Sequence, residues 1–150
     1  MSEKARMVYI ASDHAGFPLK KFLQEKLEEA GIQVKDFGTD SEDSVDYPDF
    51  MHPLASAINK GEDAVGVIVC GSGNGAQMTA NKYRKIRAAL CWTKEQAFLA
   101  RLHNDANIIS LPGRFVEFDD AWEMVETFLE TEFEGGRHER RVKKISELQE

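Results

Sequence analysis

Residues 64–75, Ala-Val-Gly-Val-Ile-Val-Cys-Gly-Ser-Gly-Asn-Gly, decide the fold class of this chain. The first seven are apolar and rich in β-branched side chains, and they lack the alternation of a half-exposed strand. Strands of this kind are covered on both faces, as in parallel sheets. The glycine-rich part then turns the chain into a helix that we expect to run to about Lys82. A strand followed by such a helix is the repeating unit of an α/β fold.

Short apolar runs and runs with helical spacing alternate on both sides of this stretch. Gly31 and Gly61 are expected to end two helices, Thr93 with Gln96 has the spacing of a capping box, and Asp119 is expected to cap a further helix. The alternation predicts an α/β three-layer sandwich with a mainly parallel five-stranded sheet. Its expected strands are residues 7–11, 33–37, 64–70, 88–91 and 108–111.

Length, composition and charge narrow the classes of function. The 150 residues suit one domain, residues 1–150, and carry a net charge of -7. An acidic chain is a poor general binder of nucleic acid, although a local basic cluster can still bind a small phosphate. Two cysteines are too few for a disulfide framework, and no apolar stretch has membrane-spanning length. The N-terminal residues lack the apolar core of a signal peptide, so we expect a cytoplasmic protein that binds neither nucleic acid nor membrane.

Ligands of parallel sheets bind at the carboxyl ends of the strands. That rule selects residues 12–16, the loop around Asp46, residues 70–75 and the segment after Leu111. Cys70 ends a strand beside a glycine-rich turn whose N–H groups favour an anion or a thiolate. Two interpretations stay open, a functional thiol and a buried cysteine that behaves as a small hydrophobe. For Cys91 we expect burial in the strand next to that of Cys70.

Two histidines lie at expected junctions of strands and helices. His14 follows Asp13 after the first strand, and His103 follows a helix. Either one alone is typical of a histidine that complements a helix dipole, whereas the two together favour a site. His14, Cys70 and His103 lack local metal-ligand spacing, so we expect no metal.

The segment Gly135-Gly136-Arg137-His138-Glu139-Arg140-Arg141 is basic in an acidic chain. On the helix expected from about residue 137 to the end, Arg137, Arg141 and Lys144 share one face. Such a face suits a phosphate, or it is a solvated face that pairs with acidic groups of another subunit. The same helix has an apolar stripe of Val142, Ile145 and Leu148 that predicts docking, as in a dimer.

Together these motifs, in this order and spacing, resemble ribose-5-phosphate isomerase type B and, more broadly, the sugar-phosphate isomerases that include galactose-6-phosphate isomerase. The likeness covers nearly the whole chain. A branch of this family has a glutamate just after the glycine turn in place of the cysteine; here Ala76 and Cys70 match the cysteine branch. The motifs are Ser12-Asp13-His14-Ala15-Gly16, Asp46-Tyr47-Pro48, Cys70-Gly71-Ser72-Gly73-Asn74-Gly75, Ala80-Asn81-Lys82, His103-Asn104-Asp105 and Gly135-Gly136-Arg137-His138 with Arg141.

The resemblance implies a Rossmann-like fold, a homodimer or larger assembly with sites at the interface, and no metal or organic cofactor. It implies interconversion of ribose 5-phosphate and ribulose 5-phosphate in the pentose phosphate pathway. Cys70 would be the base, with Ser72 beside it, and His103 would open the sugar ring. The substrate contacts that it implies are Asp13, Tyr47 and Asn104 for the sugar, Gly71, Ser72, Gly73, Asn74 and Gly75 for the enediolate, and Arg137, Arg141, His14, Arg114 and His138 for the phosphate.

Three other functions remain open at this point. A six-carbon sugar phosphate, such as allose 6-phosphate or galactose 6-phosphate, is one alternative substrate. A non-catalytic phosphate- or nucleotide-binding module would use the same glycine turn, but it leaves Cys70, His103 and the arginines unexplained as a set. A redox-sensing thiol protein would need Cys91 as its resolving cysteine.

Overall fold

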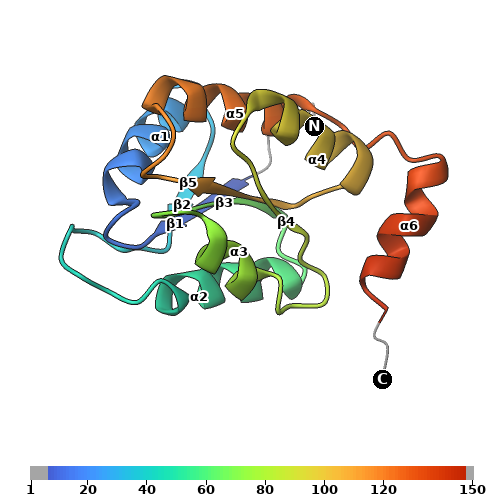
Figure 1. Ribbon diagram of the computed structural model, residues 1–150, viewed down its shortest axis with the longest axis horizontal. Helices are drawn as coiled ribbons and strands as arrows, with labels where there is room; N and C mark the ends of the chain where they lie inside the picture. The colour runs from blue at the N-terminus through green and yellow to red at the C-terminus, as the bar shows by residue number, and fades with distance from the viewer. Residues whose placement is uncertain (1–6, 148–150) are drawn as a thin grey trace.

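Five parallel strands form one sheet in the order β2-β1-β3-β5-β4 (Figure 1). The computed structural model describes residues 7–147. The predicted three-layer α/β sandwich is confirmed, and every strand pair in this part of the chain is parallel. In chain order the elements are β1 (Met7–Ser12), α1 (Phe17–Glu29), β2 (Val34–Asp36), α2 (Pro48–Asn59), β3 (Ala64–Cys70), α3 (Asn74–Ala80), β4 (Ala88–Leu90), α4 (Lys94–Asn104), β5 (Ile108–Pro112), α5 (Phe118–Glu130) and α6 (Arg137–Ile145).

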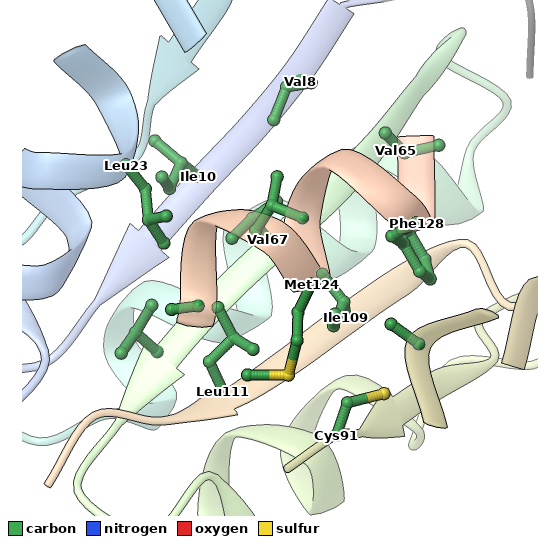
Figure 2. Close-up of a cluster of buried hydrophobic side chains, with 14 of the residues drawn as sticks. Val8, Ile10, Leu23, Val65, Val67, Cys91, Ile109, Leu111, Met124 and Phe128 are labelled. Carbon is green, nitrogen blue, oxygen red and sulfur yellow. The ribbon is translucent and has the colours of Figure 1, made fainter. Parts of the chain in front are cut away.

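Helices cover both faces of the sheet, which explains the continuous apolar run of β3. Helices α1, α4 and α5 lie on one face, and α2 and α3 lie on the other (Figure 1). Val65 and Val67 of β3 point into the first layer with Leu23 and Phe128 (Figure 2). Ile68 points into the second layer. Each side chain of β3 is therefore buried, whichever face it takes.

The N-terminal caps of two helices, α4 and α5, differ from the predictions. The hydroxyl of Thr93 accepts a hydrogen bond from the N–H of Gln96 at 3.1 Å, but the amide oxygen of Gln96 accepts from the N–H of Trp92, one residue before the cap. The prediction that Asp119 caps α5 is wrong. Glu117 is the N-cap, with extended backbone, and Asp119 lies in the first turn, where its charge still complements the helix dipole.

Two buried cations, Lys20 and Arg101, each hold a loop against the helix that carries them. Lys20 is 1% exposed, and its ammonium donates to Asp36 Oδ1 at 2.6 Å and to the carbonyl of Thr39. Arg101 donates to Asp105 Oδ1 at 2.9 Å and to the carbonyl of Thr131 at 3.1 Å. The first set ties α1 to the loop after β2. The second ties the end of α4 to the segment that leads to α6.

Helix α6 stands beside the sandwich and lies against α4 rather than on either sheet face (Figure 1). It begins at Arg137 as predicted, but it ends at Ile145, so the expectation that it runs to the end of the chain is wrong. Val142 is buried, whereas Ile145 is 55% exposed; Leu148, the third member of the predicted stripe, lies outside the described residues. Within residues 7–147, none of the helices combines the length and apolar character that crossing a bilayer requires.

Candidate active site

The carboxyl ends of β1, β3 and β5 meet at one edge of the sheet. Ser12 pairs with Val69, and Cys70 pairs with Pro112, so the residues that follow these strands lie side by side. This edge holds Asp13, His14, Tyr47, Cys70, the glycine turn of residues 71–75, and Arg114, which we call the carboxyl-edge group. It is the edge that the sequence predicted for ligand binding.

Asp13 is held tightly against the end of β3. Its N–H donates to the carbonyl of Val69 at 3.2 Å, and its Oδ1 accepts from the N–H of Gly16 at 2.9 Å. Gly16 allows this close approach because a Cβ there would lie 2.6 Å from the carbonyl oxygen of Val69. The Asp13 carboxylate is therefore buried and fixed beside the last residue of β3.

Cys70 is 4% exposed at the end of β3, directly before the glycine turn. Its carbonyl accepts from the N–H of Gly113 at 2.8 Å, and the N–H of Arg114 donates to the carbonyl of Gly71 at 3.0 Å. The Arg114 side chain also lies over the turn, because a Cβ on Gly71 would be 3.3 Å from its Nη1. A thiol, a guanidinium and a turn of backbone N–H groups thus adjoin, which suits a base acting beside an anionic centre.

Buried contacts set the conformation of the glycine turn. Gly73 has a φ of +80°, which favours glycine, and a Cβ there would be 2.5 Å from Leu90 Cδ1. The hydroxyl of Ser110 donates to the carbonyl of Gly73 at 2.7 Å. The hydroxyl of Ser72 accepts from the N–H of Asn74 at 3.2 Å. Ser72 therefore supports the turn on which the candidate anion-binding N–H groups lie.

The loop between β2 and α2 brings two further predicted residues to this edge. The ring of Tyr47 lies against Gly75, where a Cβ would be 2.4 Å from its Cζ. His14 Nδ1 accepts from the N–H of Val45 at 3.2 Å. A ring nitrogen that accepts a hydrogen bond carries no proton, so neutral His14 presents an N–H donor at Nε2.

The remaining predicted residues lie at the opposite edge of the sheet. His103 and Asn104 end α4, which leads into the start of β5, whereas Cys70 is level with Pro112 at the end of β5. From Ile108 to Pro112 the strand rises about 13 Å. Together with Glu134, which the sequence did not predict, these remaining residues form a set that we call the amino-edge group; it consists of His103, Asn104, Glu134, Arg137, His138 and Arg141.

Histidines are stacked within the amino-edge group. The ring centroids of His103 and His138 are 4.3 Å apart, and the planes are 16° from parallel. Glu134 Oε1 lies 3.4 Å from His138 Nε2 and 3.8 Å from His103 Nε2. The pKa of His138 is lowered from its ordinary value, first because burial disfavours the charged ring and then because His103 and Arg137 add positive charge nearby. The lowered pKa favours the neutral form of the His138 ring.

Arg137 and Arg141 are exposed on α6, beside α4. A single chain thus brings together Cys70, the predicted base, and its neighbours. Separately, it brings together His103, the predicted acid, and the two arginines. It does not bring the two groups together. Glu134 was missed by the sequence reasoning. Residues four apart lie on one face of a helix, so the spacing of Glu134 and His138 could have indicated a contact between them. Gly135 and Gly136, however, have positive φ angles and lie between them outside any helix.

The two cysteines do not form a redox pair in this structure. Cys91 is buried as expected, but the expectation that its strand neighbours that of Cys70 is wrong, because β5 lies between β3 and β4. Cys91 also points into the core on the opposite face of the sheet (Figure 2). Burial raises its pKa to about 12, which makes it an inert structural thiol.

Comparison with known proteins shows the family of this chain. A model described as Ribose/Galactose Isomerase matches residues 8–145, so the chain belongs to this family. The probable ribose-5-phosphate isomerase B of Mycoplasma pneumoniae is 43% identical over 92% of this chain and 91% of its own.

Solved structures agree with this membership. The crystal structure of a ribose 5-phosphate isomerase from Thermotoga maritima is 50% identical, with a TM-score of 0.93 over 95% of this chain and 99% of its own. The crystal structure of ribose-5-phosphate isomerase B from Mycoplasma genitalium, with bound ribulose 5-phosphate, is 39% identical, with a TM-score of 0.91 over 96% of both chains.

Proposed function

We propose that this chain interconverts ribose 5-phosphate and ribulose 5-phosphate through an enediolate, as the aldose–ketose isomerase of the pentose phosphate pathway. The observation that carries the proposal is the buried thiol of Cys70 at the end of β3, beside the glycine turn, in a member of this family. Similar proteins bear the name of this activity. The family description also includes galactose, so a six-carbon sugar phosphate is the second candidate substrate.

Proton transfer is assigned to Cys70. The thiolate removes the C2 proton of the open-chain aldose, the C–H electrons form the C1–C2 double bond, and the carbonyl electrons move to O1. Return of the proton to C1, with transfer of the O2 proton to O1 and formation of the C2 carbonyl, gives the ketose. N–H groups of residues 71–75 stabilise the charged oxygens of the enediolate, and Ser72 supports that turn. A thiolate suits this role because one positioned base can remove the C–H proton and return it to the neighbouring carbon.

Ring opening and substrate positioning are assigned to residues of the carboxyl-edge group and the amino-edge group together. His103 donates a proton to the ring oxygen, and Asp13 holds a sugar hydroxyl. Tyr47 and Asn104 contact the sugar. The phosphate is bound by Arg137 and Arg141, together with Arg114, His14 and His138. Holding the phosphate orients the reacting carbons beside the base.

The separation of the two groups supports a homodimer in which each site is composite. The carboxyl-edge group of one subunit meets the amino-edge group of the other, and a two-fold axis makes both sites at once. Helix α6 of the single domain, residues 1–150, docks on the partner subunit. Its exposed Ile145 and exposed arginines support this docking. A tetramer would be two such dimers. Two free cysteines support a location in the reducing cytoplasm.

The experiment that tests this function compares turnover of ribose 5-phosphate in EDTA by wild type, Cys70→Ala and Cys91→Ala. We expect wild type and Cys91→Ala to be active without any added cofactor. We expect Cys70→Ala to lose turnover but to bind the phosphate ligand with unchanged affinity. Activity of wild type on allose 6-phosphate or galactose 6-phosphate alone would transfer the proposal to six-carbon sugars. Phosphate binding without turnover of any of these sugars would identify a binding module instead.

A further inference from the structure

Glu134 lies between two histidines at a place where the proposed reaction gives it no role. Its Oε1 is 3.4 Å from His138 Nε2 and 3.8 Å from His103 Nε2. One ligand atom from each of the three residues lies within 4.8 Å of the other two. Three elements supply them: His103 from α4, His138 from α6, and Glu134 from the segment between α5 and α6.

Two of these three separations are close to those between the ligands of a small metal ion. Metal bonds of 2.0–2.1 Å at tetrahedral angles place neighbouring ligand atoms about 3.3–3.4 Å apart. The pair formed by His138 and Glu134 already has this spacing, and His103 is a few tenths of an ångström further away. Because stacked rings direct their nitrogen lone pairs nearly parallel, one ring must tilt toward the ion. His103 has the freedom to do so, since its side chain is 38% exposed, against 10% for His138.

An unpartnered nitrogen points to a ligand at the same place. Among the described residues, Nε2 of His138 is buried and makes no hydrogen bond, although the Glu134 carboxylate is near it. Leaving a buried polar atom without a partner destabilises the fold. A metal ion at this position would use that lone pair.

We propose that His103, Glu134 and His138 bind one divalent transition-metal ion of the zinc class in each subunit. Two imidazoles and one carboxylate form the three-ligand set of many zinc sites that keep a fourth position open. Imidazole nitrogen favours zinc, cobalt, nickel and copper over magnesium and calcium, which prefer oxygen ligands. The ion is an inhibitor here rather than a cofactor, because it occupies nitrogens that the isomerisation requires.

Inhibition follows from the proposed function and rests on it. If His103 opens the sugar ring, an ion on its Nε2 blocks the proton transfer, and turnover falls as the ion binds. If the ion binds without affecting turnover, the role assigned to His103 is wrong, but the metal site stands. Binding and turnover therefore test the two proposals separately.

The decisive experiment is calorimetric titration of the metal-free full chain with Zn²⁺, together with visible spectroscopy of its Co²⁺ complex. We expect one ion per subunit, a Co²⁺ spectrum typical of four-coordination, and no comparable binding of Mg²⁺. Glu134→Gln is the test variant. Its matched control is Glu139→Gln, which makes the same change at an exposed position of α6. Cys70→Ala is the control for Zn²⁺ that binds instead to the thiol of the carboxyl-edge group.

We expect Glu134→Gln to weaken Zn²⁺ binding at least about 10- to 100-fold, and we expect Glu139→Gln and Cys70→Ala to bind as wild type does. Failure of wild type to bind Zn²⁺ would overturn the proposal. So would equal affinity in wild type and Glu134→Gln, or loss of binding in Cys70→Ala alone. Circular dichroism of each variant confirms that it is folded before it is titrated.

Discussion

Glycine to alanine substitutions at Gly16 and Gly75 separate the contacts that hold the fold from those that shape the site. A Cβ at Gly16 would lie 2.6 Å from the carbonyl oxygen of Val69 and 2.7 Å from its Cγ1. Gly16 has a φ of -91°, which alanine adopts freely, so the effect is steric alone. Because Val69 belongs to the central strand β3, its backbone has no room to move.

At Gly75 the obstacle is a side chain rather than backbone. A Cβ there would lie 2.4 Å from Cζ of Tyr47, whose side chain is on the surface and 38% exposed. The ring can swing outward. Gly75 also lies in α3, where alanine is favoured over glycine by about 1 kcal/mol, which offsets the cost of moving the ring.

We expect Gly16→Ala to lower the free energy of unfolding by about 3 kcal/mol, at the upper end of overpacking effects. That corresponds to a decrease in Tm of about 6–12 °C for a chain of this size. For Gly75→Ala we expect a stability within about 1 kcal/mol of wild type. If Tyr47 contacts the sugar through one hydrogen bond, KM for ribose 5-phosphate rises about 2- to 10-fold.

Thermal unfolding and steady-state kinetics measure both effects, and Tyr47→Phe is the control that removes the hydroxyl without moving the ring. Equal loss of stability in Gly16→Ala and Gly75→Ala would refute the distinction between backbone and side-chain obstruction. An unchanged KM in both Gly75→Ala and Tyr47→Phe would refute the contact between Tyr47 and the substrate.

Four further predictions concern the rest of the chain. Because burial raises the pKa of Cys91 to about 12, iodoacetamide at pH 8 is expected to label Cys91 only after unfolding, as mass spectrometry of the native and denatured protein would show. Because the pKa of Cys91 is higher in the folded than in the unfolded protein, its contribution to the free energy of unfolding is complete below the ordinary pKa of 9.0 and is lost as pH rises toward 12. Urea unfolding of wild type and Cys91→Ala at a series of alkaline pH values measures this loss. Thr93→Ala removes the cap of α4 and is expected to cost about 1 kcal/mol in urea unfolding. Lys20→Met removes the donor to the Asp36 carboxylate and to the carbonyl of buried Thr39 and is expected to cost about 1–3 kcal/mol in urea unfolding, whereas the double variant with Asp36→Asn recovers part of that loss.

The sequence predicts the sheet well because its signals are local. The apolar run of β3 is buried on both faces, and Gly31, with a φ of +80°, ends α1 as expected. Long-range contacts are less predictable. Lys20 looks like a surface residue of an amphipathic helix, yet it is buried because Asp36 and the carbonyl of Thr39, distant in sequence, pair with it. Asp119 resembles a cap, but the extended residue before α5 is Glu117.

In the candidate site, too, local features were predicted from the sequence and long-range contacts were not. Asp13, which follows β1, and Cys70, which ends β3, were predicted at one edge because the carboxyl ends of parallel strands coincide. His103 lies in the last turn of α4, at the other edge of the sheet. Its stacking on His138 depends on where α6 packs, which no periodicity in the sequence specifies. The proposal that a second copy of the chain completes the site therefore needs its own test.

Mixing two inactive variants, Cys70→Ala and His103→Ala, tests the composite site most directly. In a dimer of one copy of each, one site has both substitutions and the other has neither. After complete exchange of equal amounts, half of the dimers are mixed, so about a quarter of wild-type turnover per subunit is expected to return. No recovery of turnover, with subunit exchange confirmed by native mass spectrometry, would contradict a site shared between subunits.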